Sequence, residues 1–338
     1  MKARHQGNSR RWRREPLPRM LLCLCLLAAL GCVPTIRPAT PAQQAERLIH
    51  SGLADYDAGD LAGASRKFHR AFQISASVDD RLGVADARNS LCAIQLQQGK
   101  YAGALQECRE ALEIYTARQH PQGIVAGLLN IGMIHLELHD YQAAGNDFTK
   151  ALDTAQAHQL TGLEAKALNN LGLLSKTRGD PDKARRLYER SLAINQRENN
   201  AAATAVNLNN LGTLYLEAGH PDTAVNYFWR ALKIDKDLAR SASIAADLLN
   251  LAAAYQAKAR FQTAIDYYKR SLAIFEYLSY PREIAETRYH IALLYEKTGN
   301  PAGARENYLA AIKIAERLQL RQLMENARSR LERLEQAP

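Results

Sequence analysis

Four asparagines that recur at one position of a repeating sequence are the residues best suited to recognition chemistry. Asn130, Asn170, Asn210 and Asn250 stand forty residues apart. A side-chain amide donates and accepts hydrogen bonds at once, which suits it to hold the main chain of an extended peptide without selecting its side chains. The alternative is a polar residue tolerated on a solvated helix face, although intrinsic helix propensity would favour Glu, Lys or Gln there.

A forty-residue period extends through most of the chain and identifies the elements that carry these asparagines. Each period contains an apolar run, a helix-breaking position, a small residue, usually an aromatic residue, and a closing small-plus-aliphatic pair. The helix-breaking positions are Gly59, Gly99, His139, Gly179, Gly219, Ala259 and Gly299. Apolar residues at 3.6-residue spacing on both sides of the break predict a helical hairpin. One hairpin cannot bury its apolar face alone, so the sequence predicts seven hairpins stacked as a solenoid.

The residues of the fifth period resemble the tetratricopeptide repeat family. The resemblance is carried by the small residues Gly212 and Ala224, the aromatics Tyr215 and Phe228, and the "LNNLG" opening at 208–212, which is typical of the long-period subgroup found in kinesin light chains. It implies an all-α fold: a right-handed α-solenoid of seven helix-turn-helix units over residues 45–318, with a C-terminal capping helix in 319–338.

The resemblance also implies a place for the asparagines. In tetratricopeptide solenoids the first helix of each unit lines the concave surface, and related repeats use asparagines at this position to hold a peptide main chain. We therefore expect Asn130, Asn170, Asn210 and Asn250 to form a peptide-binding ladder in the groove. Lys166, one turn before Asn170, is the only residue placed to pair with a carboxylate, so a full carboxylate clamp is not expected.

The N-terminal region has the features of a bacterial lipoprotein signal. A basic segment precedes the apolar run "MLLCLCLLAALGC" at 20–32, and the sequence Ala29-Leu30-Gly31-Cys32 resembles a lipobox. We expect a signal peptide in residues 1–31, lipid on Cys32 and a Pro-rich tether over 32–44. Val33 in place of Asp favours the outer membrane, with the protein facing the periplasm. An uncleaved anchor or an ordinary cleaved signal is the alternative.

The distribution of charge argues against nucleic acid as a partner. Residues 1–31 carry seven basic residues and one acidic residue, which leaves +3 of the net charge of +9 for the rest of the chain. Phosphate contacts would need Lys and Arg clustered on a folded face. No glycine-rich phosphate loop, nucleophile elbow or paired-cysteine motif is present, so we expect neither an enzyme nor a cofactor. His135 and His139 lack a third ligand, so no metal site is predicted.

Cys92 and Cys108 replace the small and the aromatic residue of the second period. They lie on either side of the turn at Gly99, so antiparallel helices bring them face to face. Export to an oxidising compartment would permit a disulfide. Two buried free thiols remain the alternative.

These features predict a protein-protein interaction scaffold of the bacterial envelope that binds an extended segment of a protein partner. Lipoproteins of similar layout include the pilotins of type IV pilus secretins, which favours assembly of a pilus or secretion channel. The alternative is a structural spacer or self-associating scaffold, in which Tyr227, Trp229 or Tyr267 on the outer surface drives homo-oligomerisation.

Overall fold

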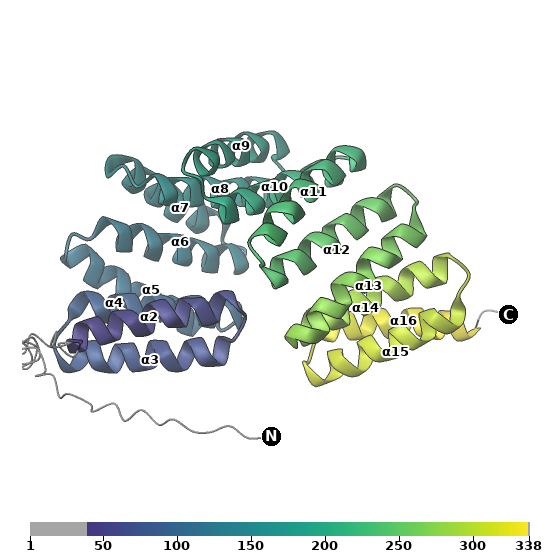
Figure 1. Ribbon diagram of the computed structural model, residues 1–338, viewed down its shortest axis with the longest axis horizontal. Coiled ribbons are helices and arrows are strands. Elements are labelled where there is room, and N and C mark those ends of the chain that lie inside the picture. The colour runs from purple at the N-terminus through teal and green to yellow at the C-terminus, as the bar shows by residue number, and fades with distance from the viewer. Residues whose placement is uncertain (1–38, 337–338) are drawn as a thin grey trace, which may run out of the picture. The chain divides into compact units, whose positions relative to one another are not determined.

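The computed structural model describes residues 39–336, and these residues form helices joined by short turns. The helices are α2 Pro41–Asp57, α3 Leu61–Ser77, α4 Arg81–Gln97, α5 Tyr101–Ala117, α6 Pro121–Glu137, α7 Tyr141–Ala157, α8 Thr161–Thr177, α9 Pro181–Arg197, α10 Ala201–Glu217, α11 Pro221–Asp237, α12 Ser241–Ala257, α13 Phe261–Leu278, α14 Pro281–Lys297, α15 Pro301–Arg317 and α16 Arg321–Gln336. Residues 41–338 are a compact unit by themselves. The all-α solenoid expected from the sequence is confirmed (Figure 1).

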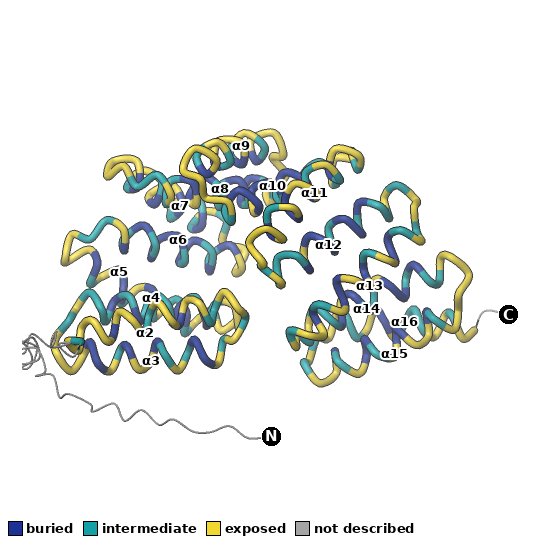
Figure 2. Tube along the Cα trace, in the orientation of Figure 1, coloured by how far each residue is buried: buried dark blue, intermediate teal, exposed yellow. Residues whose placement is uncertain are grey.

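The helices form two layers of antiparallel hairpins. Each even-numbered helix from α2 to α14 pairs with the helix that follows it, and each hairpin packs on the next. The even-numbered helices from α2 to α12 also contact one another directly, which places them in the inner layer, and α16 packs on α15 at the C-terminal end. Each helix buries one side and exposes the other (Figure 2).

A left-handed residue ends every helix that another described helix follows. All seven predicted helix-breaking positions have positive φ, including the non-glycine residues His139 at 60° and Ala259 at 55°. The same conformation recurs between hairpins, at Asp79, Gln119, Gln159, Asn199, Ala239, Ser279 and Gln319. In each turn the N–H of the residue after the left-handed one bonds back five residues, as from Asp180 to the Ser175 carbonyl at 2.9 Å. This arrangement satisfies carbonyls at the helix end, as in a Schellman motif.

The first helix begins earlier than the sequence suggested. It starts at Pro41, so residues 41–44 are helical and do not belong to an extended tether. Proline fits the first position of a helix because no intrahelical partner exists for an N–H there. Ala45, in the second turn, packs in a cluster with Ala71, Ile74 and Ala87, which anchors this helix to the solenoid. Residues 32–38 of the predicted tether and the signal peptide lie outside the described residues.

An aromatic ring of the second helix fills the space beside a glycine of the first helix in four hairpins. The pairs are Gly52 with Phe68, Gly132 with Phe148, Gly172 with Tyr188 and Gly212 with Phe228. A Cβ atom on any of these glycines would lie 2.5 to 2.7 Å from a ring carbon, and the rings are at most 1% exposed. The contact therefore fixes how closely the two helices of a hairpin approach. Among the described helices, none is long and apolar enough to cross a membrane.

We predict that Gly212→Val destabilises the solenoid by about 1–3 kcal/mol, because the added methyl groups would overlap the buried Phe228 ring. Gly162→Val is the matched control, since a Cβ atom there meets no other atom within 4 Å. Urea unfolding followed by circular dichroism measures both. Equal midpoints for the two variants would contradict the packing argument.

Candidate functional site

A groove on the inner layer contains three of the five residues predicted to bind peptide. Its cavity of about 460 Å³ is lined by side chains of α2, α4, α6, α8 and α10 and of the outer helix α9. Asn130, Asn170 and Lys166 line it together, whereas Asn210 and Asn250 do not. The apolar part of the lining consists of Leu53, Ala93, Ala126, Leu129, Met133, Leu163, Ala165, Ala203 and Val206. The groove thus combines an apolar surface with side-chain amides, a composition that suits a peptide.

Three of the four ladder asparagines hydrogen bond to the preceding repeat. Each donates its Nδ2 to the Oδ1 of an asparagine forty-one residues earlier: Asn130 to Asn89 at 3.0 Å, Asn210 to Asn169 at 2.7 Å and Asn250 to Asn209 at 3.3 Å. This explains the adjacent pair Asn209 and Asn210. One amide bonds forward to the next repeat and the other bonds back to the previous one, so the pair connects three successive inner helices.

Asn170 is the exception, and the reason is a single residue. The position forty-one residues earlier is Leu129, which has no amide to accept the bond. Among the described residues no side-chain hydrogen bond involves Asn170, and it is only partly buried in the groove. Its amide is therefore available to a ligand in full. Lys166, one turn earlier, is exposed and makes no ion pair with any described residue.

A buried polar network beneath Asn169 was missed by the sequence reasoning. Asn207 is 1% exposed and donates to Asn169 at 3.0 Å, while Asn195 donates to Asn207 at 2.7 Å. Ser191 donates to the Ala165 carbonyl at 2.7 Å. The available signal was a polar residue at position 207, where Ala87, Gly127 and Ala167 stand in the three preceding repeats. Buried polar groups need such partners, so the network ties α8, α9 and α10 together.

The electrostatics of the inner face change along the solenoid. Asp86, at the position that corresponds to Lys166 two repeats later, accepts a hydrogen bond from the Tyr115 hydroxyl at 2.6 Å. Burial raises the pKa of Asp86 and also raises that of Tyr115, whose ionisation the nearby Asp86 carboxylate further opposes. Among the residues that line the groove cavity, Lys166 is the only formally charged side chain.

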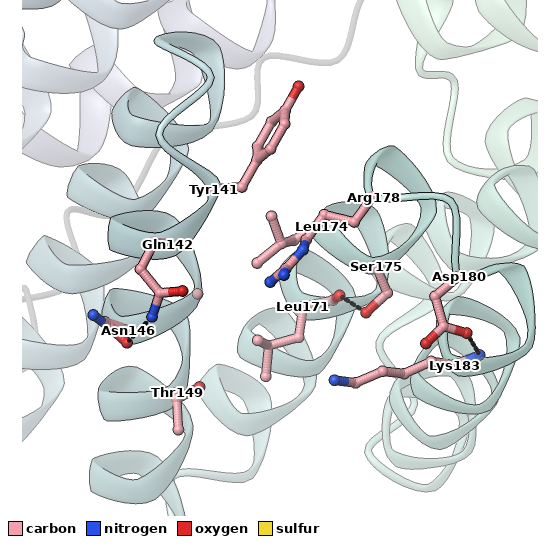
Figure 3. Close-up of a pocket in the computed structure, with 11 residues that line it drawn as sticks. Tyr141, Gln142, Asn146, Thr149, Leu171, Leu174, Ser175, Arg178, Asp180 and Lys183 are labelled. Atoms are coloured by element: carbon pink, nitrogen blue, oxygen red, sulfur yellow. Dashed lines mark hydrogen bonds between the residues drawn. The ribbon is translucent and has the colours of Figure 1, made fainter.

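A second cavity lies on the outer side, between α7, α8 and α9. It measures about 480 Å³ and opens beside Gly145, where the neighbouring repeats have Leu105 and Arg185 (Figure 3). Arg178 and Lys183 contribute its cationic groups, while Asp180 caps α9 by accepting from the Lys183 N–H at 3.0 Å. None of the predicted site residues lies in this cavity.

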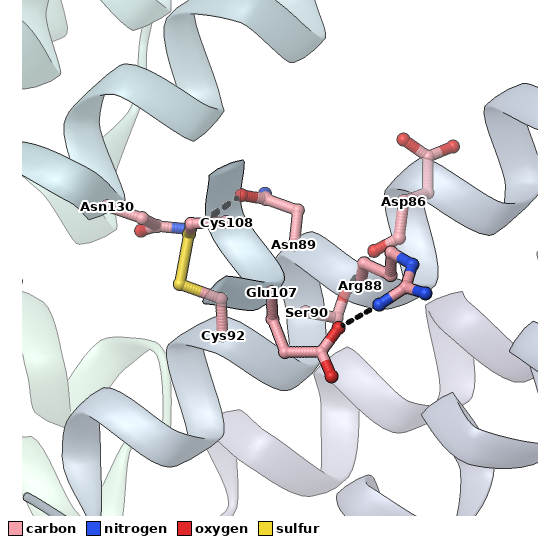
Figure 4. Close-up of a disulfide and its surroundings, with 8 residues drawn as sticks. All are labelled: Asp86, Arg88, Asn89, Ser90, Cys92, Glu107, Cys108 and Asn130. Carbon is pink, nitrogen blue, oxygen red and sulfur yellow. Dashed lines mark hydrogen bonds and ion pairs between the residues drawn. A yellow bond between two sulfur atoms is a disulfide. The ribbon is translucent and has the colours of Figure 1, made fainter. Parts of the chain in front are cut away.

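Cys92 and Cys108 form a disulfide inside the second hairpin (Figure 4). Their Cα atoms are 5.5 Å apart, both residues are fully buried, and they occupy the place of the glycine and the aromatic ring in other repeats. In the chain-entropy account, closing a loop of this size stabilises the folded state by about 3 kcal/mol. The bridge lies beside the hydrogen bond between Asn89 and Asn130, so it braces the N-terminal part of the groove.

Two further predictions concern other parts of the chain. Cys32, the predicted lipidation site, lies outside the described residues. His135 forms a close contact with Asp147, 2.7 Å from Nδ1 to Oδ2, and His139 lies in the turn with Nδ1 3.1 Å from the Tyr141 hydroxyl. The described residues contain no group of three or more His, Cys, Asp or Glu side chains arranged to hold a metal ion.

Comparison with known sequences identifies the repeats. A profile described as tetratricopeptide repeat matches residues 123–196, 163–237 and 243–317, and a second profile with the same description matches 51–123. These matches cover more than half of the chain. A comparison with curated proteins finds no match. The likeness to the kinesin light chain subgroup stays a prediction.

Solved structures share the fold at low sequence identity. The Rap conjugation gene regulator of the plasmid pLS20, in complex with the Phr* peptide, has a TM-score of 0.67 and 15% identity over 90% of this chain and 87% of its own. A Rap protein complexed with competence and sporulation factor has a TM-score of 0.57 and 12% identity over 87% and 98%. BtubC (BKLC) from P. vanneervenii has a TM-score of 0.54 and 21% identity over 67% and 92%. At these identities the similarity shows the fold alone.

We predict that Asn169→Ala lowers the free energy of unfolding by about 1–3 kcal/mol, because it leaves the amides of Asn207 and Asn210 without their acceptor. Asn170→Ala is expected to change it little, since no hydrogen bond among the described residues is lost and Ala is the better helix former. Urea unfolding of both variants decides the matter. Equal losses of stability would show that the two neighbours do not differ in role.

Proposed function

Because the chain belongs to the tetratricopeptide repeat family, whose repeats generally form interaction scaffolds rather than catalytic sites, we propose that its inner groove binds an extended segment of a partner protein. The observation that carries the proposal is Asn170, whose amide faces the groove and is free of hydrogen bonds to any described residue. An amide in this state pairs with one peptide unit of an extended chain, accepting from its N–H and donating to its carbonyl.

The surroundings of Asn170 indicate which segment would fit. Leu129, Met133 and Val206 line the same cavity, so apolar side chains of the partner find apolar surface on either side of the amide. Lys166 provides one positive charge, which favours a carboxylate on the partner close to the peptide unit held by Asn170. The partner segment is therefore extended, largely apolar and carries one acidic group.

The ladder asparagines that bond to each other contribute differently. Asn130, Asn210 and Asn250 each use one N–H in the bond to the preceding repeat, which leaves the carbonyl oxygen and the second N–H for a ligand. A Rap conjugation gene regulator with the same fold, solved in complex with the Phr* peptide, supports peptide capture by such a solenoid. The bound segment is centred on Asn170 and contacts Asn130 next.

The envelope is the proposed setting. The lipobox-like sequence supports a lipid anchor on Cys32 at the outer membrane, and the Cys92–Cys108 disulfide supports export because such bridges persist in oxidising compartments. A lipid-anchored, periplasmic peptide-binding scaffold suits the assembly of a pilus or secretion channel, which is the sharper form of the proposal.

A structural spacer or self-associating scaffold is the second candidate, and its basis is the outer aromatic surface. Trp229 is 39% exposed and meets Tyr267 edge to face at 6.1 Å. Tyr267 itself stacks on Tyr255 at 5.3 Å, and Tyr227 stacks on Tyr215 at 5.4 Å. The two tyrosines already serve packing within the chain, and Trp229, the most exposed of the three, is itself packed on Tyr267, so the groove is the better-supported site.

Binding is tested with the compact unit of residues 41–338 as bait for detergent-solubilised envelope proteins, read by mass spectrometry. We expect one partner to be enriched by the wild type and reduced by about five- to thirtyfold with Lys166→Ala combined with Asn170→Ala, since lost hydrogen bonds of about 1–2 kcal/mol have this effect. Asn146→Ala, on the outer cavity, is the control and should retain the partner. Identical partners for all three proteins would contradict the groove and favour the spacer.

The anchor is tested separately in the full-length chain. Cys32→Ser is expected to abolish incorporation of labelled palmitate and to release the protein from the membrane fraction, because no thiol remains at position 32 to accept lipid. Cys25→Ser, within the predicted signal peptide, is the matched control and should leave both unchanged. Continued labelling of Cys32→Ser would refute lipidation at this residue.

A further inference from the structure

Two successive junctions between repeats contain buried polar pairs at equivalent positions. One residue comes from the end of an outer helix and the other from the inner helix of the next repeat. At most junctions at least one of the two is small and apolar, as in the pair Ala155 and Ala167. Between the fourth and fifth repeats the pair is Asn195 and Asn207, and between the fifth and sixth it is Asp235 and Asp247. We call Asp235 and Asp247 the acid pair.

The acid pair is deeply buried, and among the described residues Arg240 is the one cation that pairs with it. Asp235 is 1% exposed and accepts from Arg240 at 3.0 Å, whereas Asp247 is fully buried and accepts from Asn209 at 2.6 Å through Oδ1. The second oxygen of Asp247, Oδ2, is buried without a hydrogen-bond partner when both carboxyl groups are ionised. Two adjacent carboxylates in such a place repel each other, and one arginine cannot neutralise both.

One added proton resolves this arrangement. If Asp247 carries a proton on Oδ2, it can donate to the Asp235 carboxylate, so the buried oxygen gains a partner and the net charge of the pair with Arg240 becomes zero. The two side chains lie within hydrogen-bonding reach of each other. We propose that the acid pair shares one proton and acts as a pH-sensitive latch between the fifth and sixth repeats.

The side-chain amide of Asn209 connects the acid pair to the inner face of the solenoid. Asn209 donates to Asp247 through Nδ2 and accepts from Asn250 through Oδ1, so a single side chain joins the acid pair to a ladder asparagine. Loss of the shared proton places a second negative charge beside Asn209 and forces α11 and α12 apart. The position of Asn250 relative to Asn210 then depends on pH.

The groups around the acid pair set the direction of the effect. Burial raises the pKa of Asp247 to about 7; the nearby Asp235 adds to the rise, while the Asn209 hydrogen bond and Arg240 oppose it. Burial also raises the pKa of Asp235, and Arg240 opposes this. Among the described residues, two other side chains act on the two carboxyl groups: Asn209 from α10 and Arg240 from the turn before α12. Asp235 itself lies on α11 and Asp247 on α12.

The sign follows from proton linkage. Above the ordinary carboxyl pKa the unfolded chain releases this proton while the folded chain keeps it, so raising the pH favours unfolding until the folded group has also ionised near pH 7. The stability that the shared proton gives to the folded state is thus fully present in acid. It is lost as the pH rises towards 7 and stays absent above that.

The test compares wild-type residues 41–338 with Asp247→Asn, which reproduces at the acid pair an amide like Asn207 in the preceding junction. We expect the unfolding equilibrium constant of the wild type, relative to the variant, to rise by up to about tenfold for each pH unit between 5 and 7. Asp237→Asn is the control, because Asp237 is exposed at the end of α11, the helix that carries Asp235, and makes no ion pair with a described residue. It should keep the wild-type pH profile.

Two further measurements keep the proposal falsifiable if the variant folds poorly. The infrared absorption of a protonated carboxyl group should be present in the wild type at pH 5 and lost by pH 8. Hydrogen exchange of α12, corrected for intrinsic rates, should accelerate over the same range more than that of α8. Parallel stability profiles for wild type and Asp247→Asn, or no protonated carboxyl at pH 5, would overturn the latch; unchanged exchange in α12 would overturn its link to the groove.

Discussion

The left-handed residue at the end of each helix is the constraint on which the rest of the solenoid depends. It reverses the chain within a turn of three residues, and all but one of the helices from α2 to α15 are seventeen residues long, so successive helices start twenty residues apart. Because an α-helix turns by about 100° per residue, one inserted residue would rotate every later side chain of that helix away from its neighbour. The regular alignment of Asn130, Asn170, Asn210 and Asn250 follows from this spacing.

The same spacing decided how much of the structure could be predicted from the sequence. The period, the small residues and the aromatic residues located both helices of each hairpin, and alignment alone predicted the turns at His139 and Ala259, whose residue types do not favour them. The turns between hairpins contain no glycine at the left-handed position and carry no common residue type. The packing of the helices on either side imposes the left-handed conformation of these turn residues. No local sequence pattern indicates that packing.

The roles of the asparagines were the harder part of the prediction. A helical wheel places Asn210 on the inner face, but the bond from its amide to Asn169 depends on the separation of α8 and α10, which is a tertiary property. The distinction between Asn170 and the other ladder residues rests on Leu129, a residue in another helix that a repeat alignment treats as ordinary core. Asn170 is therefore the ladder residue whose side chain makes no hydrogen bond within the described chain.

Buried polar pairs at the junctions are not needed for packing, since Ala155 with Ala167 and Ala315 with Ala327 fill the same place without them. An amide pair such as Asn195 and Asn207 matches donors to acceptors at any ordinary pH. It therefore fixes the register of the two helices without making their packing depend on pH. Asp235 and Asp247 offer only acceptors once both are ionised, and their complementarity exists only while one proton remains. If stability alone were at stake, alanines or amides would serve better. An acid pair at this junction therefore makes sense as a group whose state changes with its surroundings.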